Sequence, residues 1–236
     1  MSAANVPDAG GALVVFAKWP EPGRVKTRLS PPFSPEAAAE FYGCMLDDVL
    51  DTTLRAATAL GLAPCIAVDP PLARDAMARR APAGYRVVAQ SGADLGARMD
   101  RIVAECAAAG LGRVLLRGSD SPALDGGLLE AACRALDRAD LVACPDPDGG
   151  YSVIGLREAR PGCFDHAMSH DGVLEQTLAA ARRAGLTTSL VEPCFDVDTA
   201  RDLERLAERR ARPGPLPCPR TLAWLDQHHA WPDAAA

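Results

Sequence analysis

A loop with an unusual density of cations follows the first apolar segment of the chain. Lys18, Arg24, Lys26 and Arg28 lie within eleven residues, around a turn that contains prolines and Gly23. Arginine contacts phosphate oxygens through paired N–H groups and lysine acts as a point charge, so these residue types are typical of a polyphosphate site. We therefore expect the loop to bind a nucleotide, and Lys26 also to stabilise charge during catalysis. A solvated basic loop is the alternative interpretation.

Carboxylates follow two later segments that have the composition of strands. Asp120 comes four residues after the strand-like run 113–116, and Asp196 and Asp198 alternate along a second segment. Alternation places Asp196 and Asp198 on one side of an extended chain. Mg²⁺ and Mn²⁺ take one or two carboxylates together with substrate phosphates, which makes these three residues candidate metal ligands. Capping of a turn or a helix is the alternative role for Asp120 and Asp198.

A further acidic residue, Asp148, precedes Gly149 and Gly150 between two predicted strands. Paired glycines allow a ligand to approach bare backbone, although a tight turn explains them equally well. We predict that Gly149 and Gly150 contact the substrate. We also predict that Asp148 is the base that deprotonates an acceptor hydroxyl.

The loop after another predicted strand contains Gln90, Gly92 and Asp94 and opens a predicted helix. Backbone amides at the start of a helix can contact a base, a ribose or a phosphate. These three residues are therefore added to the candidate nucleotide site.

Strand-like and helix-like patterns alternate along the chain, and they must position these loops. The pattern predicts a single α/β domain with a mostly parallel sheet flanked by helices. In such sheets ligands bind beyond the carboxyl ends of the strands, where each of the loops above begins. The predicted strands are 13–17, 64–68, 85–89, 113–116, 140–143, 152–156 and 187–191, and the predicted helices are 37–60, 95–109, 127–136, 173–184 and 200–210.

Length and composition bound the domain organisation. The 236 residues are 48% hydrophobic, enough for one large core without disulfide support, and the eight cysteines include no C-x-x-C pair. We expect a flexible tail at 1–10, one α/β domain with the candidate nucleotide site at 11–210, and a proline-rich connector with a short helix at 211–236. That helix is expected to pack on the domain or on a second copy, which leaves a homodimer open.

Charge and hydropathy exclude several classes of partner. The net charge of −6 argues against binding of nucleic acid or an anionic membrane, and no apolar run approaches the ~20 residues of a membrane span. The first ten residues lack the layout of a secretory signal. A cytoplasmic protein that acts on small molecules is the expectation.

Taken together, the motifs resemble one family, the rSAM/selenodomain-associated transferases, also described as arsenosugar-biosynthesis-associated glycosyltransferases. The resemblance covers about residues 13–206 and implies a GT-A (Rossmann-like) fold of the nucleotide-diphospho-sugar transferase superfamily. It also implies a divalent metal held by Asp120 with Asp196 or Asp198, and phosphates facing Lys26 and Arg28. The motifs that carry the resemblance, in chain order, are Phe16–Leu29, Gln90–Met99, Gly118–Pro122, Asp148–Tyr151 and Asp196–Thr199.

The sequence supports a ranking of functions. A glycosyltransferase that uses Mg²⁺ or Mn²⁺ to move a sugar from a nucleotide-diphospho-sugar donor to a small acceptor comes first, because the resemblance favours it. A nucleotidyltransferase that joins an NTP to a sugar phosphate or a phosphorylated acid with release of pyrophosphate comes second, because the dense basic loop suits a triphosphate. A catalytically inactive nucleotide-binding protein comes third.

Overall fold

The computed structural model describes residues 9–168 and 170–232, so most of the expected tail at 1–10 lies outside the described residues. Every predicted strand is present, and each end lies within two residues of its predicted position. The strands are β1 Gly11–Lys18, β2 Ala63–Asp69, β3 Arg86–Ala89, β4 Arg113–Gly118, β5 Leu141–Pro145, β6 Tyr151–Leu156 and β7 Thr188–Leu190.

The helices also agree with the sequence pattern, with one addition. The short helix α2, Arg74–Arg80, follows a single 3-10 turn and was not predicted. It has only seven residues, too few for a helical repeat of apolar positions to be recognised. The other helices are α1 Pro35–Leu60, α3 Leu95–Ala108, α4 Gly126–Ala135, α5 Val173–Arg183, α6 Ala200–Ala211 and α7 Pro219–Gln227.

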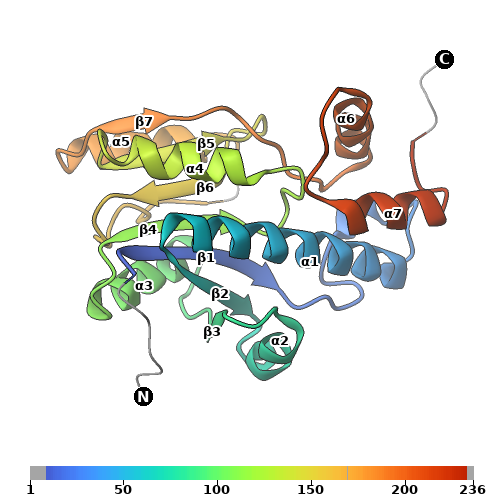
Figure 1. The fold of residues 1–236 in the computed structure, drawn as a ribbon, viewed down its shortest axis with the longest axis horizontal. Coiled ribbons are helices and arrows are strands. Elements are labelled where there is room, and N and C mark those ends of the chain that lie inside the picture. The colour runs from blue at the N-terminus through green and yellow to red at the C-terminus, as the bar shows by residue number, and fades with distance from the viewer. Residues whose placement is uncertain (1–8, 169, 233–236) are drawn as a thin grey trace.

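Within the described residues, seven strands form one mixed, mostly parallel sheet in the order β3-β2-β1-β4-β6-β5-β7. Only β6 runs against its neighbours β4 and β5. The central position of β1 follows from its sequence, because its continuously apolar run is buried on both faces. The parallel strands bring the ends of β1, β4 and β5 to one edge of the sheet (Figure 1).

Helices cover both faces of this sheet, and alternate residues of β1 point to opposite faces. Leu13 packs into a cluster with α1 and α4. Ala12 and Val14 pack into a cluster with α3 and α5 on the other face. The long helix α1 is set at its two ends by sequence signals: Ser34 caps the first turn by accepting a hydrogen bond from the Ala37 amide, and Gly61 ends the helix in the left-handed conformation.

The C-terminal helix α7 packs against α1 (Figure 1). This is the first of the two predicted arrangements, packing on the domain itself.

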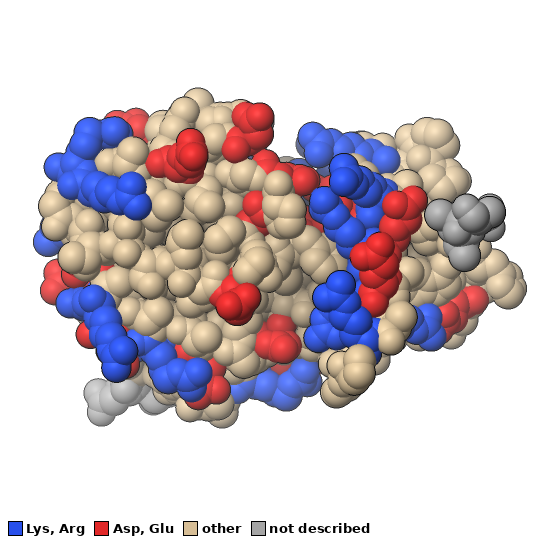
Figure 2. Space-filling model, turned by 90° about the horizontal axis from the view of Figure 1, so that it is seen from above, with Lys and Arg blue, Asp and Glu red and all other residues tan. Residues whose placement is uncertain are grey.

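Seen from above, Lys and Arg side chains are interleaved with Asp and Glu in a band on the right of the molecule, and much of the rest of this face is uncharged (Figure 2). All eight cysteines, which fall in the described part of the chain, have free thiols. Among the helices that the structure describes, none combines the length and the apolar character needed to cross a bilayer.

Candidate functional site

The basic loop leaves β1 and turns back sharply before α1. Gly23 has a φ of 75°, and a backbone hydrogen bond from Arg24 N to Glu21 O closes the turn. Lys26 also has a left-handed backbone, with φ 48° and ψ 36°, which is unusual for a residue with a side chain. A single 3-10 turn, Thr27–Leu29, follows and buries Leu29. The loop therefore turns the Lys26 side chain inward and leaves Arg24 and Arg28 at the surface.

The Lys26 ammonium is the centre of the site. Its Nζ donates to Asp120 Oδ1 and, at 2.7 Å, to Asp198 Oδ1, and its side chain is only 1% exposed. Burial alone would lower the pKa of Lys26, but the two ion pairs outweigh burial and raise the pKa above its ordinary value. For Asp198, burial tends to raise the pKa, but the charge of Lys26 outweighs burial and holds the pKa of this carboxyl below its ordinary value. Lys26 and Asp198 therefore both remain charged at neutral pH.

Tyr42 of α1 closes the base of the site. Its hydroxyl accepts from the Lys18 amide at 3.0 Å and lies 2.8 Å from Ser119 Oγ. The Lys26 ammonium lies 5.7 Å from the centre of the Tyr42 ring, within cation–π range. Burial raises the pKa of Tyr42, so the phenol stays neutral and keeps its proton. Tyr42 thus links the ends of β1 and β4 beneath Lys26.

The two acidic segments are joined through their backbones. Val197 N donates to Asp120 O at 2.8 Å, which holds the segment after β7 beside the end of β4. Asp196, next to Val197, accepts a hydrogen bond from Ser121 Oγ, and its amide donates to Asp146 Oδ2 at 2.9 Å. Burial, and then the charge of Asp120, raise the pKa of Asp196 to about 7.

A buried arginine supports the loop that carries Asp120. Arg117, the penultimate residue of β4, is 1% exposed and donates to Thr53 Oγ1 at 3.1 Å, to Ser121 O at 3.0 Å and to Gly118 O at 3.3 Å. No carboxylate of the described residues forms an ion pair with it. Burial lowers the pKa of Arg117 to about 10, so the guanidinium is still charged at neutral pH. Its hydrogen bonds fix the backbone on both sides of Asp120.

The basic loop and the two carboxylates paired with Lys26 surround one small pocket of about 200 Å³. Val25, Thr27 and Tyr42 complete the lining of this pocket. Asp196 does not line it. The structure thus brings together most of the cationic loop and two of the three predicted metal ligands. The predicted residues that line the pocket are Lys18, Arg24, Lys26, Arg28, Asp120 and Asp198.

The loop after β5 adjoins the acidic segment without lining the pocket. Asp146 accepts from the amides of both Asp148 and Asp196, and so ties the loop to the site. The Asp148 side chain is exposed, 4.0 Å from Arg205 Nη1. At Gly149 the φ is 84° and a Cβ would lie 1.8 Å from Asp171 O, so a close approach of the chain itself requires this glycine. The roles predicted for Asp148, Gly149 and Gly150 in substrate binding and catalysis stay predictions.

The residues after β3 are engaged within the protein. Gln90 is buried and donates to Ala67 O at 2.8 Å and to Ala17 O at 3.3 Å, which ties the end of β3 to β2 and β1. Asp94 caps α3 by accepting from Ala97 N at 2.8 Å. None of Gln90, Gly92 and Asp94 lines the pocket described above, and their predicted contact with a nucleotide stays a prediction.

The pocket carboxylates fit a divalent cation. Asp120 and Asp198 each direct one oxygen at the same ammonium, so two hard oxygen donors already converge on one positive charge. Within the described residues no cluster of three or more His, Cys, Asp or Glu side chains is arranged to hold a metal, so an ion here would take its other ligands from phosphate and water. Asp196 fits less well, because burial and the charge of Asp120 raise its pKa, which favours the protonated carboxyl, and one of its oxygens already accepts from Ser121 Oγ.

Three residues of the site were missed by sequence reasoning. Arg117 extends a strand that was predicted to end at residue 116, and a charged residue at the end of an apolar run was the available signal. Tyr42 falls on the apolar stripe of α1, where nothing separates it from ordinary core residues. Asp146 lies between two predicted strands, and no local pattern marks it, because its link to Asp196 exists only in three dimensions.

Comparisons with known proteins agree with this architecture. A protein from Desulfovibrio desulfuricans G20, provisionally named a nucleotide-diphospho-sugar transferase, is 30% identical over 94% of this chain and 96% of its own, with a TM-score of 0.83. CMP:2-keto-3-deoxy-manno-octonic acid synthetase in complex with CTP is 14% identical, covers 85% of this chain and 98% of its own, and has a TM-score of 0.53. The 4-diphosphocytidyl-2C-methyl-D-erythritol synthase of Anaerococcus prevotii DSM 20548 is 11% identical, covers 86% of this chain and 97% of its own, and has a TM-score of 0.54.

The last two similarities show a shared fold alone. No curated protein matches the sequence. Residues 52–169, half of the chain, match the family described as "Uncharacterized protein conserved in bacteria (DUF2064)". With this match and the long alignment to the D. desulfuricans protein, the chain belongs to the DUF2064 family, within the nucleotide-diphospho-sugar transferase superfamily.

Proposed function

We propose that the protein is a nucleotidyltransferase that joins a nucleoside monophosphate, taken from an NTP, to a small phosphorylated or hydroxylated acceptor and releases pyrophosphate. The observation that carries this proposal is the charge of the pocket. Four cationic side chains line about 200 Å³ together with two carboxylates, an excess of two positive charges. A bound Mg²⁺ would raise the excess to four, which matches the about four negative charges of a nucleoside triphosphate.

The arrangement of the cations supports binding of a chain of phosphates. Lys26 is fixed at the centre by Asp120 and Asp198, whereas Arg24 and Arg28 are exposed at the rim. An ammonium in a site that excludes most water interacts more strongly with developing negative charge than an ammonium in solution does, and so stabilises a transition state effectively. Exposed arginines can instead adjust to the outer phosphates and make paired contacts.

Asp120 and Asp198 would hold the metal. When bound, Mg²⁺ or Mn²⁺ neutralises phosphate charge and acts as a Lewis acid toward the leaving pyrophosphate. Because the Lys26 ammonium lies between the same two carboxylates, it would move from them toward the phosphates when the metal binds. Lys26 would thus contact the substrate only in the loaded site.

Two features favour glycosyl transfer as the second candidate. The family resemblance of the sequence motifs points to it, and the D. desulfuricans relative is named for a nucleotide-diphospho-sugar. The charge of the pocket argues against this second candidate. A nucleotide sugar carries about two negative charges on its diphosphate, fewer than the four excess positive charges of the pocket with a metal bound. The CTP complex of the synthetase with this fold supports a triphosphate in a site of this architecture.

A two-armed assay separates the candidates. In one arm the purified protein, Mg²⁺ and each of the four common NTPs are incubated with a panel of sugar phosphates and phosphorylated acids, and pyrophosphate is measured. In the other arm nucleotide sugars replace the NTPs, and the released nucleoside diphosphate is measured. We expect pyrophosphate that depends on the acceptor in the first arm, and none from Asp120→Asn. Diphosphate release in the second arm alone would overturn nucleotidyl transfer in favour of glycosyl transfer.

A further inference from the structure

One apolar cluster reaches both halves of the candidate site. Leu29, next to Arg28 in the basic loop, and Val197, between the two acidic residues 196 and 198, are both fully buried in it. The segments that carry the cations and the carboxylates are therefore anchored in the same group of side chains. The cluster also contains Phe33, Phe41, Met45, Leu203, Leu206, Cys218, Trp224 and Leu225.

The C-terminal helix α7 supplies the largest side chain of this cluster. The Trp224 ring lies 5.3 Å from the ring of Phe33 and 5.1 Å from that of Phe41, centre to centre. The Phe33 amide donates to Leu29 O at 2.9 Å, so Phe33 is tied directly to the end of the basic loop. Trp224 thus packs against the segment that follows Lys26, although α7 lies outside the part of the chain expected to form the transferase domain.

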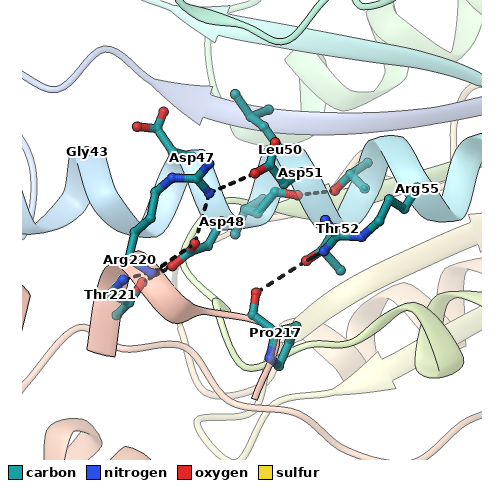
Figure 3. Close-up of polar contacts among 12 residues, drawn as sticks. Gly43, Asp47, Asp48, Leu50, Asp51, Thr52, Arg55, Pro217, Arg220 and Thr221 are labelled. Atoms are coloured by element: carbon teal, nitrogen blue, oxygen red, sulfur yellow. Dashed lines mark hydrogen bonds and ion pairs between the residues drawn. The ribbon is translucent and has the colours of Figure 1, made fainter. Parts of the chain in front are cut away.

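Docking of α7 depends on a buried carboxylate of α1. Asp48, with a fully buried side chain, accepts from Thr221 N and Thr221 Oγ1 at 2.8 Å each, and from Arg220 N and Nη1 at 3.2 Å each (Figure 3). The N-cap residue of α7, Cys218, makes no side-chain capping hydrogen bond. Asp48 therefore satisfies the free amides at the start of α7 from another helix. Arg220 also pairs with Asp51 at 2.7 Å.

A second tether joins α7 to the acidic side of the site. Arg210 of α6 donates to both carboxylate oxygens of Asp226 in α7, at 2.6 and 2.9 Å. Helix α6 begins at Ala200, two residues after Asp198. The helix α7 consequently bridges α1, the end of the basic loop and the helix that follows the acidic segment.

We propose that Asp48 and Trp224 are positioning residues of the site. Asp48 fixes α7, Trp224 holds Leu29 and Val197 in one packed cluster, and this packing keeps the Lys26 ammonium in register with Asp120 and Asp198. The effect on nucleotide binding rests on the function proposed above, whereas the effect on the geometry of the segments does not. A purely structural role of α7 would lower overall stability without a preferential effect on the site.

Amide hydrogen exchange tests the geometric part. The reporters are the amides of Leu29, Phe33 and Val197, which donate to Lys26 O, Leu29 O and Asp120 O, and Leu116 in the central strand β4 reports on global unfolding. In Asp48→Asn and Trp224→Ala we expect the three reporters to exchange at least tenfold faster than in wild type, with Leu116 changed less than threefold. Trp224→Phe keeps an aromatic ring and should restore the reporter rates to within threefold of wild type.

Leu129→Ala is the matched control. Leu129 is fully buried on α4 in a different apolar cluster, so its truncation removes core contacts without touching α7. We expect no selective acceleration of the three reporters in this variant. Reporter rates that stay at the wild-type value in both Asp48→Asn and Trp224→Ala, or that rise only in proportion to Leu116 in every folded variant, overturn the proposal.

Titration with Mg²⁺–CTP and Mg²⁺–ATP, read by calorimetry, adds the functional part. We expect at least a fivefold weaker affinity in Asp48→Asn and an affinity within twofold of wild type in Leu129→Ala. Failure of the wild-type protein to bind any nucleotide would contradict the proposed function, and the exchange rates would still decide whether Asp48 and Trp224 position the site. Nucleotide affinity unchanged in Asp48→Asn despite faster exchange would overturn the link between positioning and binding.

Discussion

Replacement of Lys26 by methionine removes one charge from the centre of the site while nearly preserving the length of the side chain. Because Nζ bonds to one oxygen of Asp120 and one of Asp198, these two oxygens lie within roughly 5–6 Å of each other at normal hydrogen-bond lengths. At an effective dielectric constant of about 20, unit charges about 5 Å apart repel by roughly 3 kcal/mol. The two side chains are 40% and 39% exposed, so solvent screening reduces this to about 1–2 kcal/mol.

The unpaired carboxylates should lower the thermal midpoint of Lys26→Met at neutral pH. For a chain of this length about 1 kcal/mol corresponds to roughly 2–4 °C, so we expect a midpoint about 2–8 °C below that of wild type. Mg²⁺ or Mn²⁺ should then stabilise the variant more than wild type, because the ion replaces the missing ammonium. At a metal concentration about 100 times the dissociation constant the gain is about 2.7 kcal/mol.

Differential scanning fluorimetry with and without each metal, in the absence of nucleotide, measures both effects. Lys18→Met is the control, since Lys18 lies at the exposed rim of the same pocket and forms no ion pair with the described residues. Its midpoint should remain within about 1 °C of wild type, with and without metal. Equal responses of wild type and Lys26→Met to Mn²⁺ would refute the idea that Lys26 and the metal compete for Asp120 and Asp198.

Three further predictions concern the surrounding structure. Arg28→Ala should weaken binding of an Mg²⁺–NTP, measured by calorimetry, by roughly five- to tenfold at low salt and by less at high salt, because salt screens exposed charges. No change in affinity at either ionic strength would indicate a solvated loop. Arg117→Met should cost roughly 2–4 kcal/mol in urea unfolding, because buried acceptors lose their donor, and a stability like that of wild type would contradict the role given to this arginine. Gly149→Ala should lower the melting temperature measured by circular dichroism, because its Cβ would collide with Asp171 O. Gly150→Ala should leave the melting temperature unchanged, because there is open space at its Cβ. Equal melting temperatures of the two variants would contradict the close approach to Asp171.

The fold was predictable because local signals agree with the tertiary structure. Apolar β-branched runs such as 13–17 mark strands buried on both faces, and Ser34 and Gly61 mark the two ends of α1. The helix α2 lacked such signals, since it is short and its only buried residue is Met77. Sequence reasoning thus located the elements wherever a repeat of at least two turns or a capping residue was present.

The candidate site was only partly predictable. The loops were found because each follows a strand, and the ends of parallel strands meet at one edge of the sheet. The pairing of Lys26 with both Asp120 and Asp198 depends on contacts between segments 94 and 172 residues apart, which no local pattern encodes. Asp48 was equally hidden, because a carboxylate within a helix is usually solvated, and only the docked α7 explains its burial.

The bond from Val197 N to Asp120 O has a consequence for protein engineering. This bond joins the two acid-bearing segments through main-chain atoms and does not involve the side chains at 120 and 198, so exchange of those side chains should leave their points of attachment unchanged. Histidine at either position would present a nitrogen donor from the same anchor, and imidazole ligands suit Zn²⁺, Cu²⁺ or Ni²⁺ better than Mg²⁺. The metal proposed for this site could therefore be changed by redesign at two positions, without rebuilding the strands that carry them.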